Sequence, residues 1–192
     1  IVRQVLKSVA GRMLGGGVAN RRIRGRHCGD SLVLAFHNVV PDNEPARGDR
    51  SLHLPVSVFV EFIDRLLEIL SPCGLEQAFL PAESPRLAIT FDDAYRGALT
   101  LALPELCRRG IPSTVFVPTA RLGNADFWWD VLATEDGVLD PASREHAMQA
   151  LQGDDALIRA WAREEGRRLT SMPDLWRSAT VDELIAASTL KG

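Results

Sequence analysis

Residues 87–95 read Leu87-Ala88-Ile89-Thr90-Phe91-Asp92-Asp93-Ala94-Tyr95. The first five are apolar or β-branched, and together with Arg86 they predict a buried strand over residues 86–91. Two adjacent carboxylates, Asp92 and Asp93, stand at the end of that strand. Because an unpaired carboxylate is costly beside a core, such a pair is typical of cation binding, pairing with a base or proton chemistry. The stretch therefore predicts both the central strand and a candidate functional site.

A helix and a further strand follow the two acids. Residues 96–109 have helical spacing, Pro104 is expected to kink this helix or begin its second half, and Gly110 ends it. Residues 111–117, Ile-Pro-Ser-Thr-Val-Phe-Val, predict the next buried strand. A strand–helix–strand unit with short turns implies parallel strands joined by a right-handed crossover.

Another predicted strand precedes this unit. Residues 31–36, Ser-Leu-Val-Leu-Ala-Phe, form a short apolar run that ends at His37. Ligands of parallel α/β folds bind at the carboxyl ends of strands, so we expect His37 to lie near Asp92 and Asp93. Two interpretations stay open for His37: a hydrogen-bonded structural residue, or a residue that contacts a substrate.

Residues 59–70 predict an amphipathic helix, because their apolar side chains recur at helical spacing. Ser57 is the expected N-cap of this helix, and residues 71–74, Ser-Pro-Cys-Gly, are expected to end it. Residues 74–80 then predict a short strand or an extended segment.

The chain beyond Pro118 is predicted to be mostly helical, with no strand over residues 140–170. A capping box, Thr180 with Glu183 three residues later, predicts the start of the last helix. Two roles are open for residues 128–130, Trp-Trp-Asp. The tryptophans pack this region onto the rest of the protein, which is the commoner role, or they stack on a sugar ring.

The composition is that of one soluble globular domain: 192 residues, 46% hydrophobic and 24% charged. No apolar run approaches the ~18–20 residues that span a bilayer, and no signal peptide is visible. Cys28, Cys73 and Cys107 lie far apart and are expected to be small core residues without a disulfide framework. The chain begins with Ile1 and ends in an apparent turn, so we expect both ends to be cut and leave the compartment open.

Charge is spread unevenly along the chain. Residues 1–27 hold seven bases and no acid, whereas the remainder holds 15 bases and 25 acids. The basic segment can contact a membrane surface or an anionic polymer, although a solvated leader is the alternative. The acidic remainder argues against nucleic acid as the main partner.

The motif Thr90-Phe91-Asp92-Asp93-Ala94-Tyr95, with Leu-Pro-Glu-Leu at residues 103–106 and Gly-Ile-Pro-Ser-Thr-Val-Phe-Val at 110–117, resembles the polysaccharide deacetylases. This family is also known as the NodB homology domain or carbohydrate esterase family four. Residues 34–39 resemble the strand that often opens these domains. The resemblance implies an α/β fold, a distorted (β/α) barrel of the polysaccharide deacetylase type, partial in this chain. Its expected parts are a basic N-terminal segment (1–30), the first strands and helices of the barrel (31–123) and, after the third to fourth strand, a mostly helical insertion (124–192).

The resemblance implies a metal-dependent hydrolase that removes acetyl groups from the N-acetylated sugars of a polysaccharide. Carried over to this sequence, Asp92 is the general base and Asp93 is a ligand of a divalent metal, with zinc expected. Zinc lowers the pKa of bound water toward ~7 and polarises a carbonyl, while a nearby carboxylate takes the proton of the attacking water. His37 is the expected substrate-binding residue.

This chain departs from the family pattern at two points. Ala94 stands where the family usually has glycine, a mild change if the backbone φ there is negative. The family completes its metal site with a later His-x-x-x-His pair and has further Arg, Asp and His motifs. No two of the four histidines, His27, His37, His53 and His146, have that spacing. We therefore expect the remaining ligands beyond Gly192.

Two other function classes stay open. A Mg²⁺-dependent phosphohydrolase also places acids at a strand end, but its acids are commonly one residue apart, and no Gly-rich phosphate loop stands near Asp92. The other alternative is an inactive or truncated module that binds a polysaccharide or a partner, which the missing histidines favour.

Overall fold

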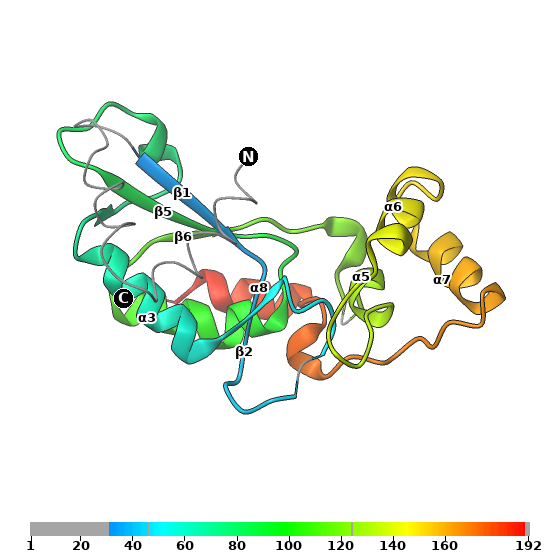
Figure 1. The fold of residues 1–192 in the computed structure, drawn as a ribbon. Coiled ribbons are helices and arrows are strands. Elements are labelled where there is room, and N and C mark those ends of the chain that lie inside the picture. The colour runs from blue at the N-terminus through cyan, green and yellow to red at the C-terminus, as the bar shows by residue number, and fades with distance from the viewer. Residues whose placement is uncertain (1–30, 46, 124, 191–192) are drawn as a thin grey trace.

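The computed structural model describes residues 31–45, 47–123 and 125–190. Figure 1 shows a sheet of strands with helices packed along one side of it, and a separate group of helices beyond the ends of the strands. That group, the helical insertion, consists of α5 (Trp128–Val131), α6 (Pro141–Gln149) and α7 (Asp155–Glu164).

The larger sheet is built around β5 (Arg86–Phe91), at the predicted position. Its partners all run parallel to it and are β1 (Ser31–Phe36), β4 (Ser71–Pro72) and β6 (Ser113–Val115). Phe36 lies opposite Phe91, so β1 and β5 end at the same level. β5 is buried from Leu87 onward, as a continuous apolar run in the centre of a parallel sheet should be.

A smaller parallel sheet continues from the end of β1. It pairs β2 (Asn38–Val40) with β3 (His53–Pro55), and Asn38 lies opposite His53. His37 is the single residue between β1 and β2. The two sheets therefore meet at the edge where the candidate site residues stand.

Three helices enclose the main core: α3 (Val56–Leu67), α4 (Leu103–Arg108) and α8 (Val181–Ser188). α4 continues a π-helical segment, Ala98–Ala102, and Pro104 stands in its first turn, where a missing N–H has no helical partner to lose. Gly110 follows with φ +66°, a conformation that favours glycine, so it ends the helix as predicted. The largest fully buried side chains of this core include Phe59, Ile63, Leu66, Leu87, Ile89, Phe91 and Tyr95.

The helical insertion has its own small core of Trp128, Leu139, Ala147 and Ile158. Side chains cap its helices: Asp140 accepts from Ser143 N–H at the start of α6, and Asp154 accepts from Leu157 N–H at the start of α7. The capping box predicted from Thr180 and Glu183 is present at the start of α8. Short 3₁₀ turns occur at Glu76–Phe79, Thr119–Arg121 and Asp174–Trp176.

Two local predictions are wrong. Ser57 does not cap α3, which begins at Val56 with Pro55 as its N-cap; the Ser57 N–H is instead bonded to the Asp42 carboxylate at 2.9 Å. Residues 74–80 are not a strand, because they contain the 3₁₀ turn Glu76–Phe79. The strand that pairs with β5 here is β4, just before these residues, and the pairing ends where the Cys73 N–H donates to Leu87 C=O.

The fold is mixed α/β with parallel sheets and, within the described ranges, six α-helices. The predicted α/β class is confirmed, whereas the described strands form open sheets and a barrel is not shown. No helix among these residues is long and apolar enough to cross a membrane. Cys73 is buried and free, as expected for a small core residue. Cys107 is free but only partly buried, so it is not a core residue, and Cys28 lies outside the described residues.

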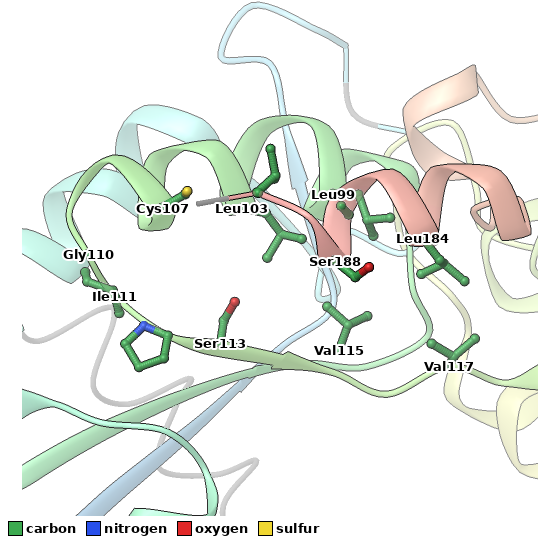
Figure 2. A pocket seen from close by; sticks show the side chains of 13 residues that line it. Leu99, Leu103, Cys107, Gly110, Ile111, Ser113, Val115, Val117, Leu184 and Ser188 are labelled. Carbon is green, nitrogen blue, oxygen red and sulfur yellow. The ribbon is translucent and has the colours of Figure 1, made fainter. Parts of the chain in front are cut away.

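An apolar groove of about 750 Å³ lies between α4, β6 and α8 (Figure 2). Leu99, Leu103, Val115, Leu184 and Leu190 are among its lining residues. Neither Asp92, Asp93 nor His37 lines it. The groove is therefore separate from the candidate site.

Candidate active site

The acid pair begins at the last hydrogen bonds that join the end of β5 to its neighbours. The Asp92 N–H donates to Phe36 C=O at 2.8 Å, and the Phe116 N–H donates to Phe91 C=O at 2.7 Å. These two bonds tie the end of β5 to its neighbours on both sides. They fix the point at which Asp92 and Asp93 leave the sheet, and both side chains are half-buried there.

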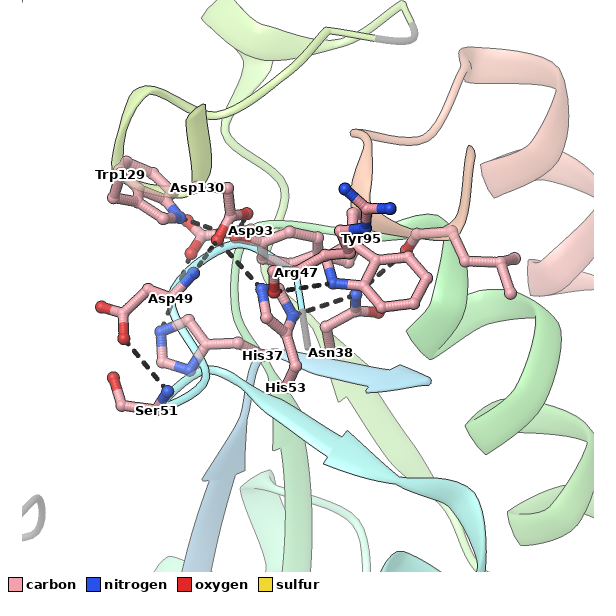
Figure 3. Close-up of polar contacts among 12 residues, drawn as sticks. His37, Asn38, Arg47, Asp49, Ser51, His53, Asp93, Tyr95, Trp129 and Asp130 are labelled. Carbon is pink, nitrogen blue, oxygen red and sulfur yellow. Dashed lines mark hydrogen bonds and ion pairs between the residues drawn. The ribbon is translucent and has the colours of Figure 1, made fainter. Parts of the chain in front are cut away.

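His37 lies beside Asp93, as the strand ends predict. Its Nε2 is 3.7 Å from Asp93 Oδ2, and the two side chains are 20% and 25% exposed (Figure 3). This is ion-pair distance if the imidazole is protonated, and both groups remain accessible to solvent. The structure thus brings His37 together with the acid pair; the roles of the three residues stay predictions.

The acid turn, residues 92–95, has an unusual backbone. Asp93 has φ +68° and Ala94 has φ +48°, so two consecutive non-glycine residues are left-handed. This conformation costs roughly 1–2 kcal/mol per L-residue, although aspartate tolerates it better than most. Alanine in place of the family's glycine at position 94 is expected to be a mild change if φ is negative. Because φ is positive, that condition is not met, and alanine bears a conformational cost that glycine would avoid.

Tyr95 anchors the far end of the acid turn. Its side chain is fully buried, its hydroxyl donates to Asp130 Oδ2 at 2.7 Å, and it accepts from the Trp129 indole N–H at 2.6 Å. Burial, followed by the nearby Asp130 carboxylate, raises the pKa of Tyr95 well above its ordinary value. The phenol therefore stays protonated and keeps donating to Asp130.

Asp130 is the centre of a buried polar network (Figure 3). Its side chain is inaccessible to solvent, and α5 carries it to the acid turn. Its Oδ2 accepts from the Tyr95 hydroxyl, while Oδ1 accepts from the Asp49 N–H at 2.8 Å and contacts His53 Nε2 at 2.9 Å. Several hydrogen bonds to one carboxylate are what a buried acid needs.

His53 is held by both of its ring nitrogens. Nε2 faces Asp130, and Nδ1 lies 3.2 Å from Asn38 Nδ2. The same Asn38 amide nitrogen donates to Leu175 C=O at 3.0 Å, which orients the amide and makes His53 Nδ1 an acceptor. This arrangement favours the tautomer in which Nε2 is the donor to Asp130. With both nitrogens engaged, His53 is a structural member of this network and not a metal ligand.

Backbone hydrogen bonds from the segment before α8 also reach the acid turn. The Ala179 N–H donates to Ala94 C=O and the Arg96 N–H donates to Arg177 C=O, each at 2.9 Å. Tyr95 and Ser178 form the antiparallel bridge between them. The turn is therefore held from the chain that follows the helical insertion as well as from α5.

Trp128 is buried, and Trp129 is half-buried and packed against its neighbours. Trp128 is only 3% exposed, and the Trp129 ring stacks on Phe127 at 4.9 Å with the planes 15° apart. The Arg121 guanidinium lies over the Trp129 ring at 5.7 Å. Of the two roles left open by the sequence, the structure supports packing over sugar stacking.

The described residues do not complete a metal site. They contain no group of three or more His, Cys, Asp or Glu side chains placed to hold an ion. Asp93 and His37 offer two donors near one point, whereas protein zinc sites use three or four protein ligands. This donor set alone therefore does not fit a zinc centre.

Sequence reasoning missed the network around Asp130. Tyr95 belongs to the quoted motif, but its role as an anchor was not predicted, and neither Asp130 nor His53 was assigned a role. The available signal was weak: Asp130 is one polar residue after two tryptophans, and His53 is one polar residue in an apolar run.

No protein-family model matches this chain, and no curated protein matches it either. Among solved structures, the fold is similar to that of IcaB from Ammonifex degensii. The two share 16% sequence identity over 84% of this chain and 82% of that chain, with a TM-score of 0.44. A likeness at this level is too low to support any statement about function.

Proposed function

We propose that this chain provides the acid pair of a hydrolase that removes acetyl groups from the N-acetylated sugars of a polysaccharide. The observation that supports the proposal is the pair Asp92 and Asp93 at the carboxyl end of β5, with His37 at the end of the adjacent β1. The surrounding sequence motif adds the resemblance to the polysaccharide deacetylases. The left-handed backbone at Asp93 is also typical of functional sites.

The proposed roles follow from position. Asp92 takes the proton of the water that attacks the acetamide carbonyl, a role for which a half-buried carboxylate is suited. Asp93 is a ligand of a divalent cation, and His37 beside it contacts the substrate. When bound, the cation would polarise the carbonyl and acidify the water.

Zinc is the cation we propose, and it requires ligands that the described residues do not supply. Asp93 and His37 are the donors available near one point in the described part. The proposal therefore divides into two separate parts, the base Asp92 and the cation at Asp93.

Acetate release from a pentamer of β-linked N-acetylglucosamine, with zinc in excess, tests the role of the base. We expect the wild-type chain to release acetate and Asp92→Asn to lose this activity. The matched control is Asp136→Asn, an exposed carboxylate outside the site, which should leave the rate unchanged. Equal rates in the wild type and Asp92→Asn would remove Asp92 from its role.

A second candidate function is binding without turnover. It is favoured by the lack of a third metal ligand among the residues described. In that case the wild type and Asp92→Asn would bind the pentamer equally, and neither would release acetate at any zinc concentration.

A further inference from the structure

The strained acid turn needs support on both sides. A pair of left-handed non-glycine residues persists only where the surrounding structure over-determines it. On one side, the Asp92 N–H is fixed to Phe36 C=O at the end of the sheet. On the other side, Tyr95 is the first residue after the two left-handed ones. What holds Tyr95 therefore decides where the carboxylates of Asp92 and Asp93 point.

Two groups hold the Tyr95 hydroxyl: the Trp129 indole N–H donates to it at 2.6 Å, and Asp130 accepts a hydrogen bond from it. The phenol reaches Asp130 Oδ2 at 2.7 Å in a region with no solvent access to either residue. In such surroundings a hydrogen bond is strong, and the loss of one partner leaves the other buried and unpaired. The backbone bonds from Ala179 and Arg177 fix the chain on either side of Tyr95 but make no contact with its hydroxyl.

Asp130 is itself fixed from the other sheet and its loop. His53 on β3 and the Asp49 N–H both contact its Oδ1. Gly48 makes this approach possible: a Cβ there would lie 2.4 Å from Asp130 Oδ1 and 2.8 Å from His53 Nε2. Gly48 also has φ +62°, a conformation that favours glycine, and its backbone lies close to the Asp130 carboxylate. The carboxylate is thus a fixed point to which the turn is tied.

We propose that Asp130 is a positioning residue, whose buried carboxylate acts through Tyr95 to hold Asp92 and Asp93 in place on their left-handed turn. The helical insertion, which contributes Asp130, is then part of the site. The effect of Asp130 on the conformation of the acid turn does not depend on the proposed function. Only the consequence for turnover rests on it.

Three substitutions test the proposal. Tyr95→Phe removes the hydroxyl and keeps the ring, Asp130→Asn removes the charge and keeps the shape, and Ala94→Gly removes the need to force a Cβ into the left-handed region. The control is Ser143→Ala, which removes another buried hydroxyl. This hydroxyl donates to Asp140 Oδ2 at 2.8 Å, and neither residue belongs to the acid turn.

The first readout is the backbone carbon chemical shifts of Asp93 and Ala94, which report the sign of φ without any need for activity. We expect these shifts to move away from left-handed values in Tyr95→Phe and in Asp130→Asn, and to stay unchanged in Ser143→Ala. Unchanged shifts in both variants would overturn the proposal. If one variant fails to fold, the other gives the same decision.

The second readout is acetate release from the N-acetylglucosamine pentamer. A displaced acid pair lowers kcat by about tenfold or more, while KM stays within about twofold. Adding Ala94→Gly to Tyr95→Phe should restore most of the lost kcat, because glycine adopts the left-handed conformation at position 94 without support and only Asp93, a residue type that tolerates it, still has to be held. A variant that loses stability but keeps its kcat, or that Ala94→Gly does not rescue, contradicts the positioning role. If the wild type releases no acetate, the proposed function fails, and the chemical shifts still decide this inference.

Discussion

Replacing Ala94 by glycine isolates the energetic cost of the acid turn. Ala94 is fully buried and left-handed, with φ +48°. Three effects act on its replacement. The loss of a buried methyl group costs about 0.8 kcal/mol, and the greater freedom of glycine in the unfolded chain costs a further ~0.4–1 kcal/mol. Relief of the left-handed alanine returns roughly 1–2 kcal/mol.

These effects nearly cancel, so we expect Ala94→Gly to change the free energy of unfolding by less than about 1 kcal/mol. The matched control is Ala162→Gly in α7, which also removes a fully buried methyl group but stands in a right-handed helix. Without strain to relieve, the control should lose about 1.5–2 kcal/mol.

The assay is urea unfolding of the wild type and the two glycine variants, with the slopes compared to confirm that the unfolded states are alike. The expected result is a gap of roughly 1–2 kcal/mol between the two variants, with Ala94→Gly the more stable. Equal losses in both would refute the reasoning, since they would mean that Ala94 bears no backbone strain.

Two further predictions concern ions and pH. A zinc titration should show only weak binding, because the described residues supply two donors near one point, Asp93 and His37. This weak binding should be lost in Asp93→Ala and kept in Asp136→Ala, and zinc binding that Asp93→Ala leaves unchanged would contradict the proposed ligand. Burial raises the pKa of Glu183, but hydrogen bonds from Thr180 and the contact with Arg96 outweigh it and set the pKa below its ordinary 4.5. A carboxyl of this kind stabilises the fold above the unfolded pKa and loses the effect as the pH falls through the folded value. The stability difference between the wild type and Glu183→Gln should therefore shrink as the pH drops below 4.5, and a constant difference down to pH 3 would be inconsistent with it.

The strand that delivers the acid pair was predictable because its signal is local. A continuous apolar run identified β5, a second one identified β1, and the parallel arrangement followed from the helix between β5 and β6. Once β1 and β5 are neighbours with Phe36 opposite Phe91, the register brings His37 to the level of Asp92, at the edge where the acid pair stands. The left-handed turn at Asp93 then places its carboxylate 3.7 Å from the His37 ring. The capping box of α8 was equally local, with its two residues three positions apart.

The parts that the sequence did not predict depend on distant residues. Asp130 contacts Tyr95 from 35 positions away and His53 from 77 positions away, and no periodic pattern links them. The N-terminus of α3 is another case, because Asp42 satisfies the Ser57 N–H from the preceding loop. The backbone at Ala94 could not be inferred from residue type, since alanine prefers negative φ and is held here by its neighbours.

The most direct test of the central claim is the rate of acetate release by Asp92→Asn relative to the wild type, on the N-acetylglucosamine pentamer with zinc in excess. General base catalysis contributes about 10²–10⁴-fold to rate, so the account predicts a loss of at least that lower value with unfolding free energy unchanged within about 0.5 kcal/mol. Release at the wild-type rate by Asp92→Asn would contradict the assignment of Asp92 as the base.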